Sequence, residues 1–565
     1  MKLKKYSIFA LAVFTFVACD DVNEQNPEGS NFTAEQLQKA IEQIPERADA
    51  QFTGMFTMMG EPEGCLGQGR ADDFGFIMMA LSSDLEASDA WIPNSGYNWF
   101  STCGEWSSRN ANYANPYIRY IAPYKQMKIA NDVISNYPED TEDPTAINRI
   151  AQARAVRAYD LMWLAPYFQF NYEDNKDKPC IPLVTEKTAD AANNPRATVE
   201  AVYNQIISDL DFACEKLEGF TPTNKNQISG AVAYGLRARA YLNMGEYAKA
   251  AEDADKAIGL SGAVPASIDE VSTPSFYNIQ DHNWLWGYDM TTDMSNTERY
   301  ETVCSWTCSF SAWAYSAGAG CYAHINKLLY DKISSTDVRK GWWIDEKLHS
   351  PLLSNIAWDG ISGDAIVPLK IENVKEPMDA YTNVKFGMYS GIGSEINDND
   401  WPLMRVEELI LIKAEGLAKS GKESDGKDVL SNFVKTYRDP SYDINAQLRA
   451  RSLADEIWFQ RRVELWGEGF ATFDAKRLGT DMIRNYPGTN HCETYRWNST
   501  GNPSWFGQLI PASETNYNEA IEAFKIAQAS GIDEATKMIE QVSQIQIWDS
   551  TWANGGEASP GPGDP

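Results

Sequence analysis

The chain has 565 residues, enough for one large domain or several ordinary ones with well-buried cores. It carries 49 basic and 79 acidic residues, a formal net charge of −30. So acidic a surface repels phosphate backbones and anionic lipid headgroups, which disfavours binding to nucleic acid and peripheral binding to membranes. The chain is 12% aromatic, with 18 Trp and 27 Tyr, enough for both a core and an exposed binding surface.

The N-terminus has the parts of an export signal. Lys2, Lys4 and Lys5 are basic, and the apolar run that follows, residues 6–17, is too short to span a bilayer. The run leads into Phe16-Val17-Ala18-Cys19, which resembles a bacterial lipobox. We therefore expect residues 1–18 to be removed and Cys19 to carry a lipid, the only membrane attachment. The alternative is an ordinary signal peptide with a chance cysteine.

Beyond the signal, the composition predicts one large domain. Residues 19–45 are expected to form a lipidated tether and entry segment, because the first part of this stretch is polar and rich in turn residues. No linker divides residues 46–550, which we assign to a single domain. Within it, residues 519–549 are typical of one or two extra helices. The tail, 551–565, is rich in Gly and Pro and is predicted to be disordered.

Two segments have clear helical periodicity. In the first, residues at spacings of four and three place small side chains on one helix face, where a neighbouring helix could approach closely: Ala151, Ala155, Ala158, Met162 and Ala165. In the second, the same pattern recurs and Gly421 is placed to end the helix as a C-cap: Val406, Leu409, Ile410, Ala414 and Leu417.

One stretch matches the offsets of a tetratricopeptide repeat, with small and aromatic residues where its two helices cross: Tyr234, Ala238, Tyr241, Gly245, Tyr247, Ala250, Ala254 and Ala257. Gly245 would allow the turn between the helices. Arg237 and Gly262 depart from the pattern. The segment from Ile410 to Gly421 matches the first half and suggests a second, degenerate unit. A generic helical hairpin is the alternative.

Strand signals are sparse. Trp284-Leu285-Trp286 and Ile366-Val367-Pro368-Leu369 are short apolar runs that could form strands within long segments between helices. Residues 261–400 are rich in Gly, Ser, Asn and aromatics, a composition typical of elaborated loops rather than scaffold.

Several segments, in order along the chain, resemble SusD-like proteins of the SusD/RagB family. Residues 400–415 are similar to the family's D-x-P-L-[IM]-R-x-A-E helix, with Glu407 in place of the first Ala, and residues 461–479 are similar to its R-R-x-E-L-x-x-E-G segment. Ala471-Thr472 replaces the Arg-Trp pair that is common there. Residues 153–161 and 510–518 match two further family segments, and the chain then continues past the family pattern.

The resemblance implies a mostly α fold: tetratricopeptide-like helical hairpins around 118–260 and 403–478, and long loops with a few short strands, around 60–115 and 261–400, forming the ligand face. Members lie on the outer membrane of Bacteroidota. They cap a TonB-dependent transporter of the SusC type and deliver glycans, or in some branches peptides, into it. We therefore expect a lipid-anchored protein of the outer membrane that faces the cell exterior.

Catalytic motifs are lacking in the sequence. It contains no Gly-x-Ser-x-Gly elbow, P-loop, His-Glu-x-x-His or Rossmann glycine pattern. Nothing pairs the four widely separated histidines, His282, His324, His349 and His491. A glycosidase needs only two carboxylates, but acids in this number usually form a solvated surface. We predict no enzyme activity, no cofactor and no metal site; Glu395, Asn397, Asp398, Asn399 and Asp400 lack the EF-hand glycine and terminal Glu.

A run of charged residues in the family motif has two interpretations. At helical spacing, mixed charges could form a ligand site, but ion pairs that tie neighbouring helices together are favoured. The residues concerned are Arg461, Arg462, Glu464, Glu468, Asp474 and Arg477.

The candidate glycan site rests on aromatic residues in loop-like segments, because sugar C–H patches stack on aromatic faces while nearby polar groups bind the hydroxyls. Residues 90–106 combine aromatics, Trp106 among them, with amides; residues 306–315 form a second such segment. The predicted ligand residues are Trp91, Asn94, Tyr97, Trp99, Trp306, Trp313 and Tyr315. Each could instead be packed in the core, and a peptide ligand or a surface adhesin role remains open.

Overall fold

The computed structural model describes residues 44, 46–61, 63–67, 72–93, 100, 103–104, 106, 109–290, 309, 321–358, 360–369, 377–391, 398–503, 506–518 and 520–521. The described residues from Phe52 onward belong to one compact unit, and those before it belong to another. The described α-helices are α2 (Glu46–Thr57), α3 (Gly75–Glu86), α5 (Ala114–Ser135), α6 (Pro144–Phe168), α7 (Tyr172–Asn175), α8 (Val199–Lys216), α9 (Gly230–Met244), α10 (Tyr247–Ser261), α13 (Lys327–Tyr330), α14 (Val406–Lys419), α15 (Glu423–Tyr437), α16 (Ile444–Gln447), α17 (Leu453–Glu464), α18 (Ala471–Leu478) and α19 (Ala512–Tyr517).

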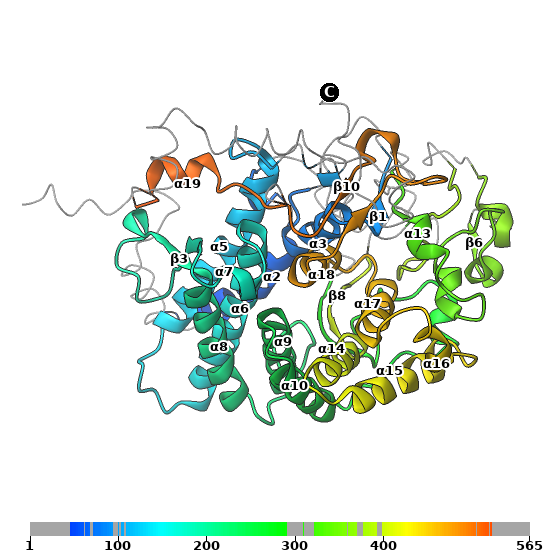
Figure 1. Cartoon of the computed structure of the whole chain (residues 1–565). Helices are drawn as coiled ribbons and strands as arrows, with labels where there is room; N and C mark the ends of the chain where they lie inside the picture. Colours follow the sequence, from blue (N-terminus) through cyan, green and yellow to red (C-terminus); the bar gives the residue numbers. More distant parts are fainter. Residues whose placement is uncertain are drawn as a thin grey trace, which may run out of the picture. The chain divides into compact units, whose positions relative to one another are not determined.

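The long helices pack in chain order. α5 packs on α6, α6 on α8, α8 on α9, α9 on α10, α10 on α14, and α14 on α15 and α17. The labels in Figure 1 can be followed along this succession. The predicted small face of α6 is buried throughout, with Ala151, Ala155 and Ala158 fully enclosed. The mostly α, hairpin-based fold class predicted from the sequence is therefore confirmed.

Helices α9 and α10 form the predicted tetratricopeptide-like hairpin. Gly245 ends α9 with a left-handed φ of +76°, a conformation that glycine adopts without steric cost. The N–H of Glu246 then donates to the carbonyl of Tyr241 at 2.9 Å. Ala238 of α9 and Ala250 of α10 are fully buried, because small side chains let the two helices cross closely.

Helices α14 and α15 form the second unit. Gly421, with φ +88°, lies in the turn between them, two residues after the last residue of α14. Gly416 marks the contact of α14 with α10: a Cβ there would lie 2.5 Å from the carbonyl oxygen of Tyr247. The backbones therefore approach as closely as glycine allows.

Among the described residues, the strands form five two-stranded antiparallel ladders. They pair β1 (Ala90–Trp91) with β5 (His324–Ile325), β2 (Pro179–Pro182) with β3 (Arg196–Thr198), β4 (Trp284–Tyr288) with β8 (Trp401–Arg405), β6 (Ala357–Trp358) with β7 (Ile361–Ser362), and β9 (Met482–Ile483) with β10 (Asn498–Ser499). The run at Trp284 is thus a strand, as predicted, and β4 and β8 are buried along their whole length.

The strand expected at residues 366–369 is wrong. Ile366 ends a 3₁₀ helix, Gly363–Ile366, and Val367 has helical backbone angles. Successive turns bond this segment to itself: the N–H of Val367 donates to Asp364 and that of Leu369 donates to Ile366, each at 3.1 Å. Local turns therefore satisfy the backbone groups that a strand would offer to a partner.

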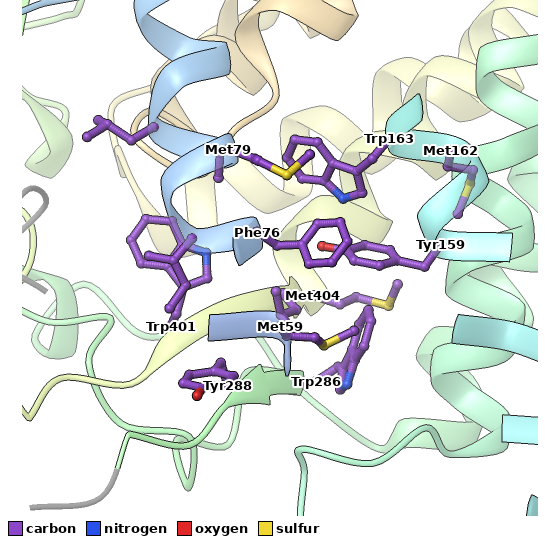
Figure 2. Packing of buried hydrophobic residues seen from close by; sticks show 14 of the residues in the cluster. Met59, Phe76, Met79, Tyr159, Met162, Trp163, Trp286, Tyr288, Trp401 and Met404 are labelled. Atoms are coloured by element: carbon purple, nitrogen blue, oxygen red, sulfur yellow. The ribbon is translucent and has the colours of Figure 1, made fainter. Parts of the chain in front are cut away.

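Helix α3 lies inside residues 60–115, where loops were expected. Every one of its residues is buried. Its first seven residues are apolar on all sides, which favours the interior, and the polar Asp84 that follows accepts from the N–H groups of Gly469 and Ala471. Figure 2 shows Phe76 of α3 beside Tyr159 and Trp163 of α6, with Trp286 of β4 and Trp401 of β8 nearby. The ring of Phe76 lies 5.0 Å from that of Tyr159 and 5.7 Å from that of Trp163, centroid to centroid. This aromatic cluster joins the helical stack to the β4–β8 ladder.

Candidate functional site

Trp91, one of the predicted ligand residues, lies on the two-residue strand β1. In the antiparallel ladder with β5, Ala90 is opposite Ile325 and Trp91 is opposite His324. Ala90 and Ile325 point into the core, whereas Trp91 is half-buried. Since successive side chains of a strand point to opposite faces, the ladder fixes which way the indole points.

The indole of Trp91 is in contact with two histidines. It stacks on the ring of His324 with centroids 4.1 Å apart and planes at 12°. The ring of His491 lies 6.1 Å away, tilted by 36°. The expectation that nothing brings the histidines together was wrong for these two, because β5 and the chain after β9 converge on one side chain. With one indole face taken up by His324, a ligand has to use the rest of the ring.

Some polar atoms around this stack have hydrogen-bond partners, and others have none among the described residues. His324 Nε2 lies 2.5 Å from Asp379 Oδ1 and 3.3 Å from Thr382 Oγ1. The surrounding chain partly desolvates the Asp379 carboxylate and opposes its ionisation, but the combined effect of His324 and the Thr382 hydroxyl outweighs this and lowers the pKa of Asp379. Burial also lowers the pKa of His491 well below its ordinary value, so that ring is neutral. Among the described residues, Trp91 Nε1, His324 Nδ1 and His491 Nδ1 are buried without a hydrogen-bond partner.

Remote side chains hold the segment before β1, residues 87–89, in place. Arg484 Nε donates to the carbonyl of Ala87 at 2.9 Å, and the Asn326 amide donates to that of Ser88 at 2.7 Å. Trp466 Nε1 donates to the carbonyl of Asp89 at 3.0 Å, and Arg462 Nε donates to the Asp89 carboxylate at 2.8 Å. Four side chains from distant parts of the chain thus hold three residues in place, which makes Trp91 part of a rigid platform. We call Trp91, His324, Asp379, Thr382 and His491 the Trp91 platform.

The other predicted ligand residues lie outside the described residues: Asn94, Tyr97, Trp99, Trp306, Trp313 and Tyr315, as does the lipidation candidate Cys19. Trp106, from the same segment as Trp91, is in the core. Its Nε1 donates to the carbonyl of Glu86 at 3.0 Å, and its ring lies 4.8 Å from that of Phe506. The sequence did not indicate His324, Asp379 or His491 as site residues. They lie far from Trp91 along the chain, and no local motif shows that the fold brings them to it.

The charged family motif forms buried ion pairs, which confirms the favoured interpretation. Glu464 of α17 is fully buried and accepts from Arg438 at 2.8 Å on both carboxylate oxygens, and from Arg405 at 3.3 Å. Glu468 accepts from Arg405 and from Lys385. The network therefore ties α15, α17 and β8 together with buried charges.

The remaining motif residues pair outward from α17 and α18. Arg461 Nε donates to Asp474 at 2.6 Å. Arg477 contacts both oxygens of Glu415 in α14, at 2.6 and 2.8 Å. These pairs hold α14, α17 and α18 at fixed separations, a structural role rather than ligand binding.

The described residues contain no cluster of three or more His, Cys, Asp or Glu side chains placed to hold a metal ion. Of the run considered for calcium, the described acids Asp398 and Asp400 accept hydrogen bonds from backbone N–H groups. Asp400 accepts from the N–H groups of Ile279 and Met290, both at 2.8 Å, and from the Tyr389 hydroxyl at 2.7 Å. Burial raises the pKa of Asp400 to about 6. Separately, no helix in the described part of the chain has the length and apolar character needed to cross a bilayer.

Two family models match the chain, in order. Residues 75–242 match a SusD-like family described as "Starch-binding associating with outer membrane", and residues 372–536 match the SusD family. Together these ranges cover more than half of the chain. The second contains the ion-pair network, and the first contains the Trp91 platform's strand β1 and helices α3 to α9. No curated protein matches.

Solved structures share the fold. A SusD-like carbohydrate binding protein from Bacteroides vulgatus is 22% identical, with a TM-score of 0.65 over 84% of this chain and 97% of that one. A SusD superfamily protein from Bacteroides thetaiotaomicron is 19% identical, with a TM-score of 0.62 over 84% and 98%. A laminarin binding SusD-like protein is 18% identical, with a TM-score of 0.55 over 77% and 91%. With two family models matched in order and the fold shared with these structures, the chain belongs to the SusD/RagB family.

Proposed function

We propose that this protein is a surface lipoprotein that binds glycans and delivers them to a TonB-dependent transporter. The observation that carries the proposal is the Trp91 platform, a half-buried indole on a rigid ladder in a chain of the SusD/RagB family. Two of the structures that share its fold are a carbohydrate binding protein and a laminarin binding protein. Those ligands belong to those proteins and support a carbohydrate ligand here.

The chemistry of the platform suits a sugar. An aromatic face binds the C–H patches of a pyranose ring, and nearby polar groups bind its hydroxyls. Asp379, whose carboxylate is exposed and ionised, is a hydrogen-bond acceptor beside the stack. We place the remaining contacts on Asn94, Tyr97 and Trp99 and on Trp306, Trp313 and Tyr315.

Export and anchoring follow from the N-terminal sequence. The basic segment, the short apolar run and Cys19 match the plan of a lipoprotein signal. We propose that the lipid on Cys19 holds the protein on the outer membrane, facing outward.

Glycan binding at the surface is most useful if the glycan passes directly to a transporter. A single sugar site binds weakly, roughly in the micromolar to millimolar range, so a binder gains most by handing its ligand directly to a barrel. We propose a SusC-like partner, encoded beside this gene, and no catalytic step in this chain. If the neighbouring genes encode no such barrel, a stand-alone adhesin or scaffold is favoured instead.

The test is calorimetric titration of the whole mature protein with two panels, one of neutral oligosaccharides and one of oligopeptides. Binding to at least one glycan, with loss of binding in Trp91→Ala, is the expected result. Binding to peptides alone refutes the carbohydrate ligand and leaves nutrient capture standing. Failure of every ligand in both panels, with the protein folded by circular dichroism, refutes both.

A further inference from the structure

Apart from the Trp91 platform, a cavity of about 190 Å³ lies beside strand β4, near the end of α8, the start of α9 and the end of α10. The residues that line it include Phe220, Lys225, Leu260, Trp284 and Leu285, and none belongs to the Trp91 platform. An engineered cavity of roughly 150 Å³ holds one benzene molecule. This cavity therefore has room for one six-membered ring.

The cavity has an apolar floor and an open mouth. Trp284 and Leu285 of β4 are buried and form the floor. Phe220, just after α8, is half-buried, whereas Leu260 near the end of α10 is 40% exposed. A sugar ring that entered past Leu260 would contact the apolar side chains of Phe220 and Leu285.

The polar side chains on the wall include one cation, Lys225, beside the hydroxyls of Thr221, Ser229 and Ser261. Among the described residues, Lys225 Nζ gives one hydrogen bond, to the carbonyl of Asp281 at 2.7 Å, which leaves donor capacity for a ligand. Trp284 Nε1 is buried and gives no donor to the cavity. Both nitrogens of His282 are engaged, with Val264 and Glu270.

Carboxylates are absent from the described residues that line the cavity, although the chain has 79 acids. Burial lowers the pKa of Lys225 and outweighs the nearby charge of Asp281, which acts in the opposite direction. An anionic group in the cavity would restore the solvation of the ammonium and accept its free N–H groups. The Lys225 ammonium beside an apolar floor suits a ring that carries a carboxylate.

We propose that this cavity is a second glycan-binding site, which takes one uronic acid residue with its carboxylate at Lys225 and its ring against Phe220, Leu260 and Leu285. The inference rests on the proposed function, because it takes the ligand to be a sugar. It adds a preference for acidic glycans, such as those with glucuronate or galacturonate units.

The experiment compares glucuronate with glucose, which differs from it only in the carboxylate, by saturation-transfer difference NMR on the whole mature protein. Lys225→Met removes the charge and keeps the alkyl stem, and Leu260→Trp fills the mouth. The matched control is Lys256→Met, at an exposed lysine paired with Glu218 outside the cavity. We expect glucuronate to bind the wild type and Lys256→Met alike, and to bind the two cavity variants at least about tenfold more weakly.

Each outcome bears on the inference. With the titrations repeated in the Trp91→Ala background, glucose binding as well as glucuronate, or glucuronate binding that the two cavity substitutions leave unchanged, overturns the second site. If neutral oligosaccharides bind and are lost in Trp91→Ala while glucuronate does not bind, the proposed function stands and the second site alone fails. If neither neutral oligosaccharides nor glucuronate bind, both proposals fail. Retained glucuronate binding in Trp91→Ala supports two separate sites.

Discussion

The indole of Trp91 and the imidazole of His324 lie face to face, with centroids 4.1 Å apart, although one residue comes early in the chain and the other lies past its middle. The contact orients the tryptophan ring. Because the ring is only half-buried, loss of the indole should affect binding more than folding. Trp91→Ala is expected to weaken glycan binding by about 1–3 kcal/mol, the range for stacking on aromatic side chains, or roughly ten- to a hundredfold.

Trp106→Ala is the matched control for that prediction, because Trp106 comes from the same segment and is buried against Phe506. Its loss should cost about 3–5 kcal/mol of folding free energy. Calorimetric titration and a melting curve on both variants separate the two effects. The opposite pattern, with Trp91→Ala the less stable variant and its binding proportional to folded protein, would identify Trp91 as a core residue. The same double measurement applies to Tyr97, Trp99, Trp306 and Trp313.

Glu464→Gln should destabilise the fold by about 3–5 kcal/mol at pH 7, because it removes the carboxylate that the buried guanidinium groups of Arg339, Arg405 and Arg438 share. Burial alone would raise the pKa of Glu464, but Arg438, Arg405 and Arg339 outweigh it and hold that pKa well below its ordinary value of 4.5. The ionised form is therefore favoured in the folded state. Its contribution is fully present above pH 4.5 and is lost as the pH falls further below.

Urea unfolding from pH 3 to 7 measures this dependence. The wild type should lose more stability on acidification than Glu464→Gln does. Glu423→Gln, at an exposed position in the first turn of α15, should stay within about 0.5 kcal/mol of the wild type. Equal effects of the two variants would show that the network contributes nothing specific.

Asp160→Asn should stabilise the protein. Asp160 of α6 is fully buried, and neither carboxylate oxygen has a partner among the described residues. Burial raises its pKa well above 3.8, so the folded state favours the protonated acid. The raised pKa leaves the free energy of unfolding unchanged below pH 3.8 and lowers it progressively as the pH rises toward the folded pKa.

The gain in Asp160→Asn is therefore expected to be small at pH 4 and about 1–3 kcal/mol at pH 7. Thermal melts at both pH values decide it. Asp177→Asn, at an 81% exposed side chain, should show no such dependence. A loss of stability in Asp160→Asn at pH 7 would mean that the carboxylate makes a bond that only an acid can make.

Gly416→Ala should destabilise the protein by about 1–3 kcal/mol, because the new Cβ would press on the carbonyl of Tyr247 where α14 crosses α10. Gly259→Ala is the control within the same helix pair. A Cβ at Gly259 meets nothing within 4 Å, so the better helix propensity of alanine should add up to about 1 kcal/mol. Denaturant unfolding of both variants tests the pair, and the same sign for both would contradict the close crossing.

Cys19→Ala should abolish lipid attachment, since the acylated sulfur is removed. Metabolic labelling with a fatty-acid probe measures it directly, and label that persists on the variant would refute the lipobox. Protease shaving of intact cells then tests whether the wild type faces outward. Protection of the wild type in intact cells, with digestion after lysis, would place it inside instead.

The sequence by itself determined the helical scaffold. Helix signals are local: the spacing of Ala151, Ala155 and Ala158 places them on one face whatever lies beyond it, and Gly245 allows the turn after α9 by its own backbone freedom. The charge pattern from Arg461 to Arg477 likewise indicated ion pairs between helices, because every member sits at helical spacing near opposite charges.

Only the tertiary structure decided where the remaining groups meet. Strands β1 and β5 have two residues each, too few for an alternating pattern, and each finds its partner far along the chain, so no local signal placed His324 on Trp91. The run at 366–369 is short and apolar like the run at 284–286, yet it folds into successive turns, and none of the described strands pairs with it. Pairing between distant segments depends on how the whole chain packs, and a short sequence window does not carry that information.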